Sequence, residues 1–349
     1  MILMSKRILA AACAAATALA LSACSPSAST GGKTSKDGTL TVMASFYPLK
    51  YLAEKVGGEH VTVTSLTPDG AEPHDLELSP KMVDSLASAD AVVYLAGFQG
   101  AVDEAVEQHA PKTVIDVSPA AQLVAIDSTS NHPGEDEDTD EAQSGEAQSG
   151  EAADHDHEGH EHEGHDHEHA DHDHHHDMSM DPHFWLDPAR MANAATLVGD
   201  KLAEADPTNA ETYKANAQAL NEELTSLGDN LVAKTSTCQI KTFVTAHTAF
   251  GYLADRTGLT QVGISGLDPE SYPSPARLAE IGKIVKDQGV TTIFTEALID
   301  PKVEQTLATD LGISTAVLDP IESQTDSSKD YAAVMNDNID ALTKANNCQ

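Results

Sequence analysis

Short apolar strands alternate with helices in two separate parts of this chain, and that alternation restricts the fold more than any other feature. The periodicity predicts strands at 40–46, 61–66, 91–95 and 113–117 and again at 242–246, 261–264, 291–295 and 314–318. Helical patterns lie between them at 48–56, 80–89, 102–108, 249–257, 275–287 and 301–311. Such spacing is typical of parallel sheets with helices on both faces. We therefore expect an α/β fold with two lobes, and the runs at 91–95 and 113–117 as buried strands.

A single long helix is predicted between the two lobes. The segment 207–234 is rich in Ala, Leu, Glu and Lys and has no proline after Pro207. Its apolar residues follow spacings of three and four: Ala217, Leu220, Leu224, Leu227 and Leu231. This spacing indicates an amphipathic helix of about 25 residues. Such a helix is either a stiff spacer between the lobes or a helix packed on one lobe.

The charge of the chain is concentrated in one insertion. The 349 residues carry 56 acidic and 20 basic side chains, and no Lys or Arg occurs between Lys112 and Arg190. The stretch 132–181 alone holds 19 acids and 12 histidines. A net charge of −36 argues against nucleic acid as a partner, because phosphate contacts need clusters of Lys and Arg. It favours cations instead.

The histidines of the insertion alternate with carboxylates in a tract that has almost no apolar residues, from Asp154 to Asp177. Such a composition predicts disorder, here for residues 132–180 as a whole. Imidazole and carboxylate are ligands for divalent metals, and many half-sites in one chain favour weak, multiple binding. We expect accessory metal binding by His155, His157, His160, His162, His165, His167, His169, His172, His174, His175 and His176. The alternative, a charged solubilising loop, does not account for this density of imidazoles.

The first residues have the features of an export signal. Lys6 and Arg7 precede an apolar run of 14 residues at 8–21, which is too short for a membrane-spanning helix of about 20 residues. The run ends in Leu-Ser-Ala before Cys24, which resembles a bacterial lipobox. That resemblance implies cleavage before Cys24 and acylation of its sulfur, with a signal peptide at 1–23 and a flexible tether at 24–38. The mature protein is then extracytoplasmic and held at the membrane only by its lipid.

Two cysteines remain in the mature chain, Cys238 and Cys348. In an oxidising compartment two such thiols pair more often than not. We expect a disulfide between them, with two free buried thiols as the alternative.

Three histidines outside the tract stand in loops near predicted element ends. His74 lies in Glu-Pro-His-Asp before a helix, His183 in Asp-Pro-His-Phe-Trp, and His247 in Thr-Ala-His-Thr at the end of a strand. The carboxyl ends of strands are where open α/β sheets place their ligands. Singly, each residue is equally compatible with a core or capping role. Together they occupy the loops that an interlobe cleft would use.

These motifs resemble those of the cluster A-I metal-binding proteins of bacterial ABC importers, above all the zinc-specific ZnuA/AdcA type, from Thr39 to about Leu342. The resemblance implies two (β/α)4 lobes joined by one rigid helix, with the metal between them. It carries over to His74, His183 and His247, and its acidic fourth position points to Asp319. The expected division is 39–206 for the N-terminal lobe, 207–235 for the helix and 236–349 for the C-terminal lobe.

Three imidazoles and one carboxylate suit a closed, tetrahedral Zn²⁺ site. A histidine at 247 favours zinc over manganese, which prefers oxygen ligands. Glu296 is a candidate acceptor that orients an imidazole, or else a strand-end carboxylate in water. The role of Glu72 stays open, since zinc-specific relatives have an acid directly before the first histidine and this chain has Pro73 there.

The expected function is capture of Zn²⁺ outside the cell by a monomeric, non-enzymatic protein that delivers it to an ABC permease. Manganese or iron binding within the same family is the nearest alternative. A secreted zinc hydrolase is disfavoured because the sequence has no His-Glu-x-x-His or Gly-x-Ser-x-Gly motif. An adhesin with the same fold is a further possibility that the sequence does not distinguish.

Overall fold

The computed structural model describes residues 38–109, 111–126 and 180–349, which all belong to one compact unit. The predicted signal peptide, the lipobox Cys24 and every histidine of the acidic tract lie outside these residues. Within the described ranges, no helix is both long enough and apolar enough to cross a membrane.

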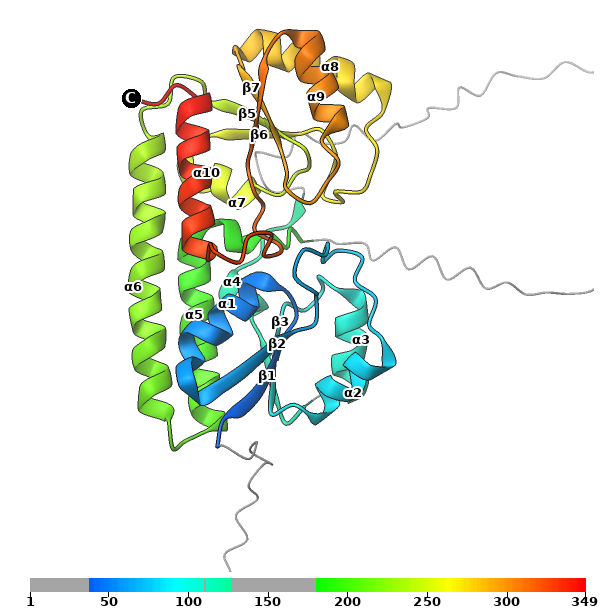
Figure 1. Ribbon diagram of the computed structural model, residues 1–349. Coiled ribbons are helices and arrows are strands. Elements are labelled where there is room, and N and C mark those ends of the chain that lie inside the picture. The colour runs from blue at the N-terminus through cyan, green and yellow to red at the C-terminus, as the bar shows by residue number, and fades with distance from the viewer. Residues whose placement is uncertain (1–37, 110, 127–179) are drawn as a thin grey trace, which may run out of the picture. The chain divides into compact units, whose positions relative to one another are not determined.

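The described chain forms two parallel four-stranded sheets, which confirms the two-lobe α/β prediction (Figure 1). Their strand orders correspond: β2-β1-β3-β4 in the first and β6-β5-β7-β8 in the second. The first contains β1 (Leu40–Ala44), β2 (Val61–Ser65), β3 (Ala91–Tyr94) and β4 (Thr113–Asp116). The second contains β5 (Thr242–Thr245), β6 (Thr260–Gly263), β7 (Thr292–Thr295) and β8 (Ser314–Val317).

Helices cover both faces of each sheet. In the N-terminal lobe they are α1 (Tyr47–Gly57), the short η1 (Gly58–His60), α2 (Pro80–Ser88), α3 (Gly100–His109), α4 (Ser118–Ala121), the short η3 (Phe184–Leu186) and α5 (Pro188–Ala205). After α6 (Ala210–Thr235), the C-terminal lobe has α7 (Gly251–Thr257), α8 (Pro275–Gln288), α9 (Lys302–Leu311) and α10 (Tyr331–Ala345).

The sequence predictions did not include α5 and α10. They also described β4 as a buried strand, which is wrong, because β4 is an edge strand and Val114 is 38% exposed.

Three apolar cores follow from the alternation of side chains along the strands. In β1, Val42 contributes to a central core and Met43 to an outer core beneath α2 and α3. In β5, Phe243 contributes to the same central core and Val244 to a second outer core beneath α8 and α9. The central core thus continues from one lobe into the other, which holds the two sheets together through buried side chains.

The long helix α6 packs against both lobes rather than one (Figure 1). It lies against α1 and α5 on the N-terminal side and against α7 and α10 on the C-terminal side. Its apolar stripe is buried as predicted, with Leu224 and Leu231 fully covered. Close approach to α5 depends on Gly199, where a Cβ atom would lie 2.4 Å from Ala217 Cβ.

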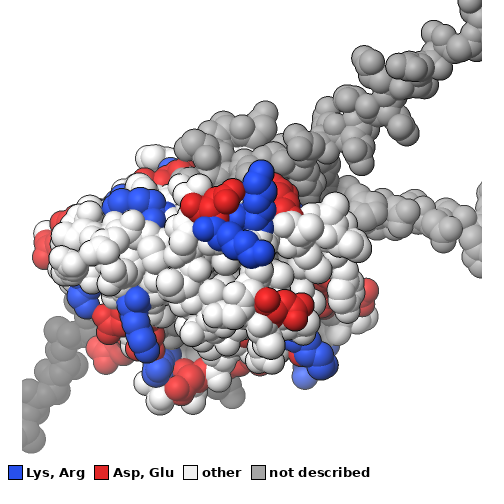
Figure 2. All heavy atoms as spheres, turned by 90° about the horizontal axis from the view of Figure 1, so that it is seen from above, with Lys and Arg blue, Asp and Glu red and all other residues white. Residues whose placement is uncertain are grey.

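Acidic and basic side chains are interspersed on the described surface that is visible in Figure 2. Among the described residues, oppositely charged side chains form isolated pairs, including Lys234 with Asp340 at 2.8 Å and Arg277 with Glu280 at 2.8 Å. Solvent-exposed pairs of this kind contribute little to stability. This part of the surface therefore presents no extended field of one sign.

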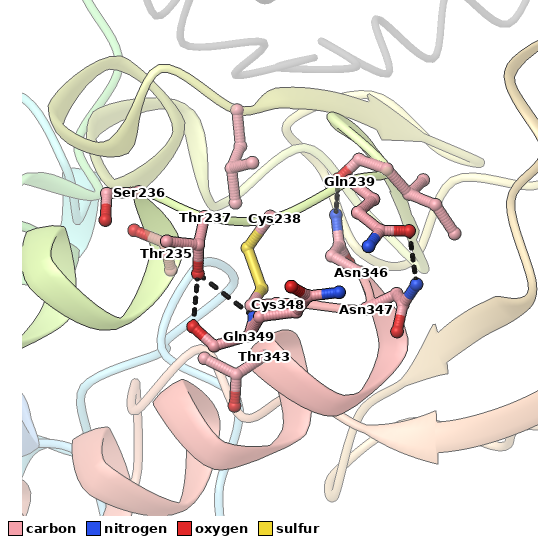
Figure 3. Close-up of a disulfide and its surroundings, with 12 residues drawn as sticks. Thr235, Ser236, Thr237, Cys238, Gln239, Thr343, Asn346, Asn347, Cys348 and Gln349 are labelled. Atoms are coloured by element: carbon pink, nitrogen blue, oxygen red, sulfur yellow. Dashed lines mark hydrogen bonds between the residues drawn. A yellow bond between two sulfur atoms is a disulfide. The ribbon is translucent and has the colours of Figure 1, made fainter.

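Cys238 and Cys348 form the expected disulfide, which joins the segment after α6 to the end of α10 (Figure 3). Hydrogen bonds reinforce the junction. The Thr237 hydroxyl donates to the carbonyl of Gln349 at 2.7 Å, and Gln239 N donates to the carbonyl of Asn346 at 3.1 Å. The end of the chain is therefore fixed to the start of the C-terminal lobe.

Replacing both Cys238 and Cys348 by serine is expected to lower the free energy of unfolding. The bond closes a loop with a sequence separation of 110 residues, and loops of this size stabilise by about 5 kcal/mol in the chain-entropy model. Urea unfolding of the mature protein with and without reductant measures the effect. Reductant should destabilise the wild type and leave the double-serine variant unchanged; equal stability of both proteins would contradict the prediction.

Candidate metal site

Three histidines and one glutamate from four distant parts of the chain converge in the structure. The ligand atoms of His74, His183, His247 and Glu322 all lie within 4.8 Å of one another. The side chains of His183 and His247 are fully buried, and those of His74 and Glu322 are 6% and 3% exposed. The predicted histidines are thus brought together, but the acidic member is Glu322 and not Asp319.

Each residue of the group comes from a loop that the fold places at the same end of the sheets. His74 follows β2, His247 follows β5 and Glu322 follows β8, as expected for the carboxyl ends of parallel strands. His183 is different, because it directly precedes η3 and the start of α5. Two lobes therefore contribute two donors each.

Buried glutamines fix two of these loops. Gln99 donates through Nε2 to the carbonyl of Pro73 at 3.0 Å, next to His74. Gln261 donates through Nε2 to the carbonyl of His247 at 3.1 Å. Both glutamines are at most 2% exposed, so their hydrogen bonds are made away from water and hold the backbone of each histidine in place.

One carboxylate oxygen lies at the centre of the group. Glu322 Oε1 is 3.2 Å from His183 Nε2 and 3.4 Å from Nε2 of both His74 and His247. Nε2 of His183 and of His247 makes no hydrogen bond in the described structure. Four ligands about 2.0–2.1 Å from one tetrahedral ion lie about 3.3 Å apart. The spacing of the donors from Glu322 thus fits one small divalent cation.

Two further carboxylates orient the buried rings. Asp181 Oδ1 lies 2.8 Å from His183 Nδ1, and Glu296 Oε1 lies 2.7 Å from His247 Nδ1. A carboxylate at Nδ1 holds the N–H tautomer there and leaves Nε2 free to bind a metal. The sequence suggested this contact for Glu296 as one of two alternatives, but assigned no role to Asp181.

Burial and charge act in opposite directions on these groups. Burial lowers the pKa of His183, but contacts with Asp181 and Glu322 outweigh it and the net pKa is raised. Burial also lowers the pKa of His247, but contacts with Glu296 and Glu322 outweigh it, and the net pKa lies well above its ordinary value. Burial would raise the pKa of Glu322, yet the three imidazoles hold it well below its usual range. The group therefore favours positive charge at its centre.

Glu72 lies beside His74 without belonging to the group. Its Oε2 accepts a hydrogen bond from His74 N at 2.8 Å, while Oε1 is 4.0 Å from His74 Nε2. Burial, together with the charge of Glu322, raises the pKa of Glu72 to about 8. Glu72 therefore supports the backbone of the first histidine.

Asp319, the predicted fourth ligand, has different contacts. Its Oδ1 accepts a hydrogen bond from Ile321 N at 2.8 Å, and its own N donates to Asn338 Oδ1 at 2.8 Å. The family resemblance pointed to Asp319 as the acid in the loop after the strand that ends at Val317. The chain turns after Asp319, so that the acid three residues later reaches the histidines.

Comparison with known proteins identifies the family of this chain. A family described as "Zinc-uptake complex component A periplasmic", ZnuA, matches residues 42–345. The chain belongs to the ZnuA family. This confirms the resemblance inferred from the three histidine motifs.

Individual relatives extend over most of the chain. The high-affinity zinc uptake system protein ZnuA of Bacillus subtilis is 31% identical over 333 residues, 94% of each chain. The zinc-binding protein AdcA of Streptococcus pyogenes serotype M3 is 33% identical over 311 residues, 88% of this chain. The ZnuA-family chain described here spans only 56% of the length of that AdcA.

A solved structure shares the fold. The Zn(II)-bound ZnuA-like domain of Streptococcus pneumoniae AdcA has a TM-score of 0.66 and 29% sequence identity. The match covers 88% of this chain and 99% of that domain. The two chains therefore share the two-lobe α/β fold.

In metal-free form, this ZnuA-family chain is expected to be more stable at about pH 6 than at about pH 8.5. The raised pKa values of His183 and His247 mean that both rings bind protons more tightly when folded. The two rings contribute fully to the free energy of unfolding when the pH is below the ordinary histidine pKa of 6.5. This contribution is lost as the pH rises through the pKa values of the folded state. Thermal unfolding in the presence of a chelator measures the difference.

The variant Glu322→Gln is the control for this measurement, because it removes the carboxylate that both rings share. Its stability should change less between the two pH values than that of the wild type. An equal change in both proteins would show that other acidic groups, rather than this site, cause the dependence.

Proposed function

We propose that this protein captures Zn²⁺ outside the cytoplasm and delivers it to the membrane permease of an ABC transporter. The observation that carries the proposal is the buried convergence of three imidazole nitrogens and the carboxylate of Glu322 within 4.8 Å. The N-terminal lobe supplies two imidazole nitrogens, and the C-terminal lobe supplies one nitrogen and one carboxylate oxygen. These four donors form a closed set of the kind that zinc prefers. In this role the protein carries out no reaction on its cargo.

The proposed ligands are His74, His183, His247 and Glu322. A set with three imidazoles favours zinc over manganese, because Mn²⁺ prefers oxygen donors. The carboxylates of Asp181 and Glu296 would fix the rings of His183 and His247 from behind. The charge of these two acids and of Glu322 would compensate that of a divalent ion in an interior that excludes water.

The start of the sequence supports the proposed location. The apolar run at 8–21 and the following Leu-Ser-Ala-Cys24 support a cleaved signal at 1–23 and a lipid on Cys24. A streptococcal relative that is 33% identical over 313 residues bears the name zinc-binding lipoprotein AdcA. A lipid anchor and a tether at 24–38 would hold the binding domain near its permease.

The acidic tract at 154–177 would be an accessory segment that binds further zinc weakly. Its eleven histidines, from His155 to His176, provide many half-sites. They would raise the amount of metal held near the protein without forming the site that is delivered to the permease.

Titration of the mature protein with zinc is expected to show one tight site and several weaker ones. Deleting 154–177 should remove only the weaker class, because the four proposed ligands lie elsewhere in the chain. Replacing His183 by alanine should weaken the tight site by at least about 100-fold and leave the weak class unchanged. Elemental analysis and chelator competition measure both classes. Loss of the tight site on deletion of the tract would refute the assignment.

The variant His247→Glu is expected to shift the ratio of Zn²⁺ to Mn²⁺ affinity toward manganese. It exchanges an imidazole for a harder oxygen donor. The variant His247→Gln is the matched control, since it supplies an oxygen without a charge. Competition between the two ions in chelator-buffered solution gives the ratio. An unchanged ratio in both variants would show that the third histidine does not determine selectivity.

A further inference from the structure

The turn that carries Glu322 contains a residue in an unusual conformation. Ile321 has a φ of +59°, the left-handed region that β-branched residues rarely enter. Its side chain is 1% exposed, so the strained backbone cannot be attributed to a loose surface loop. Such a conformation persists only where its surroundings impose it, and it often occurs at functional sites.

Contacts within the C-terminal lobe impose it from one side. Asp319 Oδ1 accepts a hydrogen bond from Ile321 N at 2.8 Å, which closes a tight turn two residues long. Asn338 of α10 fixes Asp319 in turn, since Oδ1 accepts from Asp319 N at 2.8 Å and Nδ2 donates to Asp319 O at 2.6 Å. The turn is thereby attached to α10, the helix that follows it (Figure 1).

Contacts from the N-terminal lobe hold the turn on both sides of Glu322. Trp185 Nε1 donates to the carbonyl of Pro320 at 2.7 Å, and Gly70 N donates to Ser323 Oγ at 2.7 Å. Trp185 is two residues after His183, and Gly70 is four residues before His74. The two loops that carry the N-terminal histidines therefore also fix the position of the opposite carboxylate.

We propose that Asp319 is a positioning residue that, together with Trp185 from the other lobe, holds Ile321 left-handed and so directs Glu322 at the three histidines. This inference rests on the proposed function, because it concerns the same site. Its consequence is a dependence of Glu322 on contact between the lobes. Where the lobes separate, the bonds to Pro320 and Ser323 are lost and the strained turn can relax, which withdraws one of four ligands.

The variants Asp319→Ala and Asp319→Asn separate this role from that of a ligand. Asparagine keeps an oxygen that can accept from Ile321 N, whereas alanine does not. We expect Asp319→Ala to weaken zinc binding about tenfold, mainly through faster dissociation, and Asp319→Asn to stay within about threefold of the wild type. An equally large loss in both variants, or no loss in Asp319→Ala, would overturn the proposal.

A matched control is available in the same connection. Asp326 Oδ1 accepts from Ser328 N at 2.9 Å, the same two-residue turn in an exposed position. Asp326→Ala should therefore leave zinc affinity unchanged.

If Asp319→Ala does not fold, Trp185→Phe tests the same turn from the other lobe, because it keeps a ring and removes the N–H donor. It should also weaken binding about tenfold, and an unchanged affinity would contradict the proposal.

A measurement without metal distinguishes failure of this inference from failure of the proposed function. Trp185 is the only tryptophan of the chain, and its N–H is bonded to the turn. In chelator, the emission maximum of Trp185 should shift in Asp319→Ala and match the wild type in Asp319→Asn. Unchanged emission in Asp319→Ala would refute the positioning role. A wild type that binds no zinc would refute only the proposed function.

Discussion

A buried carboxylate surrounded by three imidazoles determines what this structure can do. A charge at the position of Glu322, 3% exposed, is costly unless positive charge accompanies it. The raised pKa values of His183 and His247 show one way in which the folded chain supplies that charge, by protons. A divalent cation is the other. Under the proposed function, protons and metal would therefore compete for the same nitrogens.

The rest of the fold keeps the four donors at a fixed spacing. They come from two sheets, and small shifts between the sheets would separate them. The central core is continuous across both lobes, and α6 packs on helices of each. The disulfide between Cys238 and Cys348 fixes the end of α10, the same helix that holds Asp319 through Asn338. The disulfide and the Glu322 turn are thus attached to the same helix.

Much of this architecture was predictable from local sequence, because strands and helices follow from periodicity and from caps. Ser79 is an example, because it directly precedes the helical pattern at 80–89 and its Oγ caps α2 by accepting from Met82 N. The helices α5 and α10 carry comparable signals, since Asp187 and Asp330 cap them through their side chains. The alternation of strands does not reveal these two helices, whereas their capping residues do. The exposure of β4, by contrast, depends on its place at the sheet edge, which local sequence does not specify.

The identity of the fourth donor could not be predicted in the same way. Three histidines lie in motifs that can be recognised one by one, whereas the choice between Asp319 and Glu322 depends on the φ of Ile321. That angle is set by Asn338, 19 residues after Asp319, and by Trp185, 135 residues before Pro320. No pattern within the turn encodes contacts from such distances. Asp319, the acid nearest the strand, has the shorter side chain and accepts a hydrogen bond from Ile321 N, while the longer Glu322 side chain extends from the strained turn to the histidines. For a site assembled between two lobes, the sequence therefore predicts only those residues whose own loop determines where the side chain points.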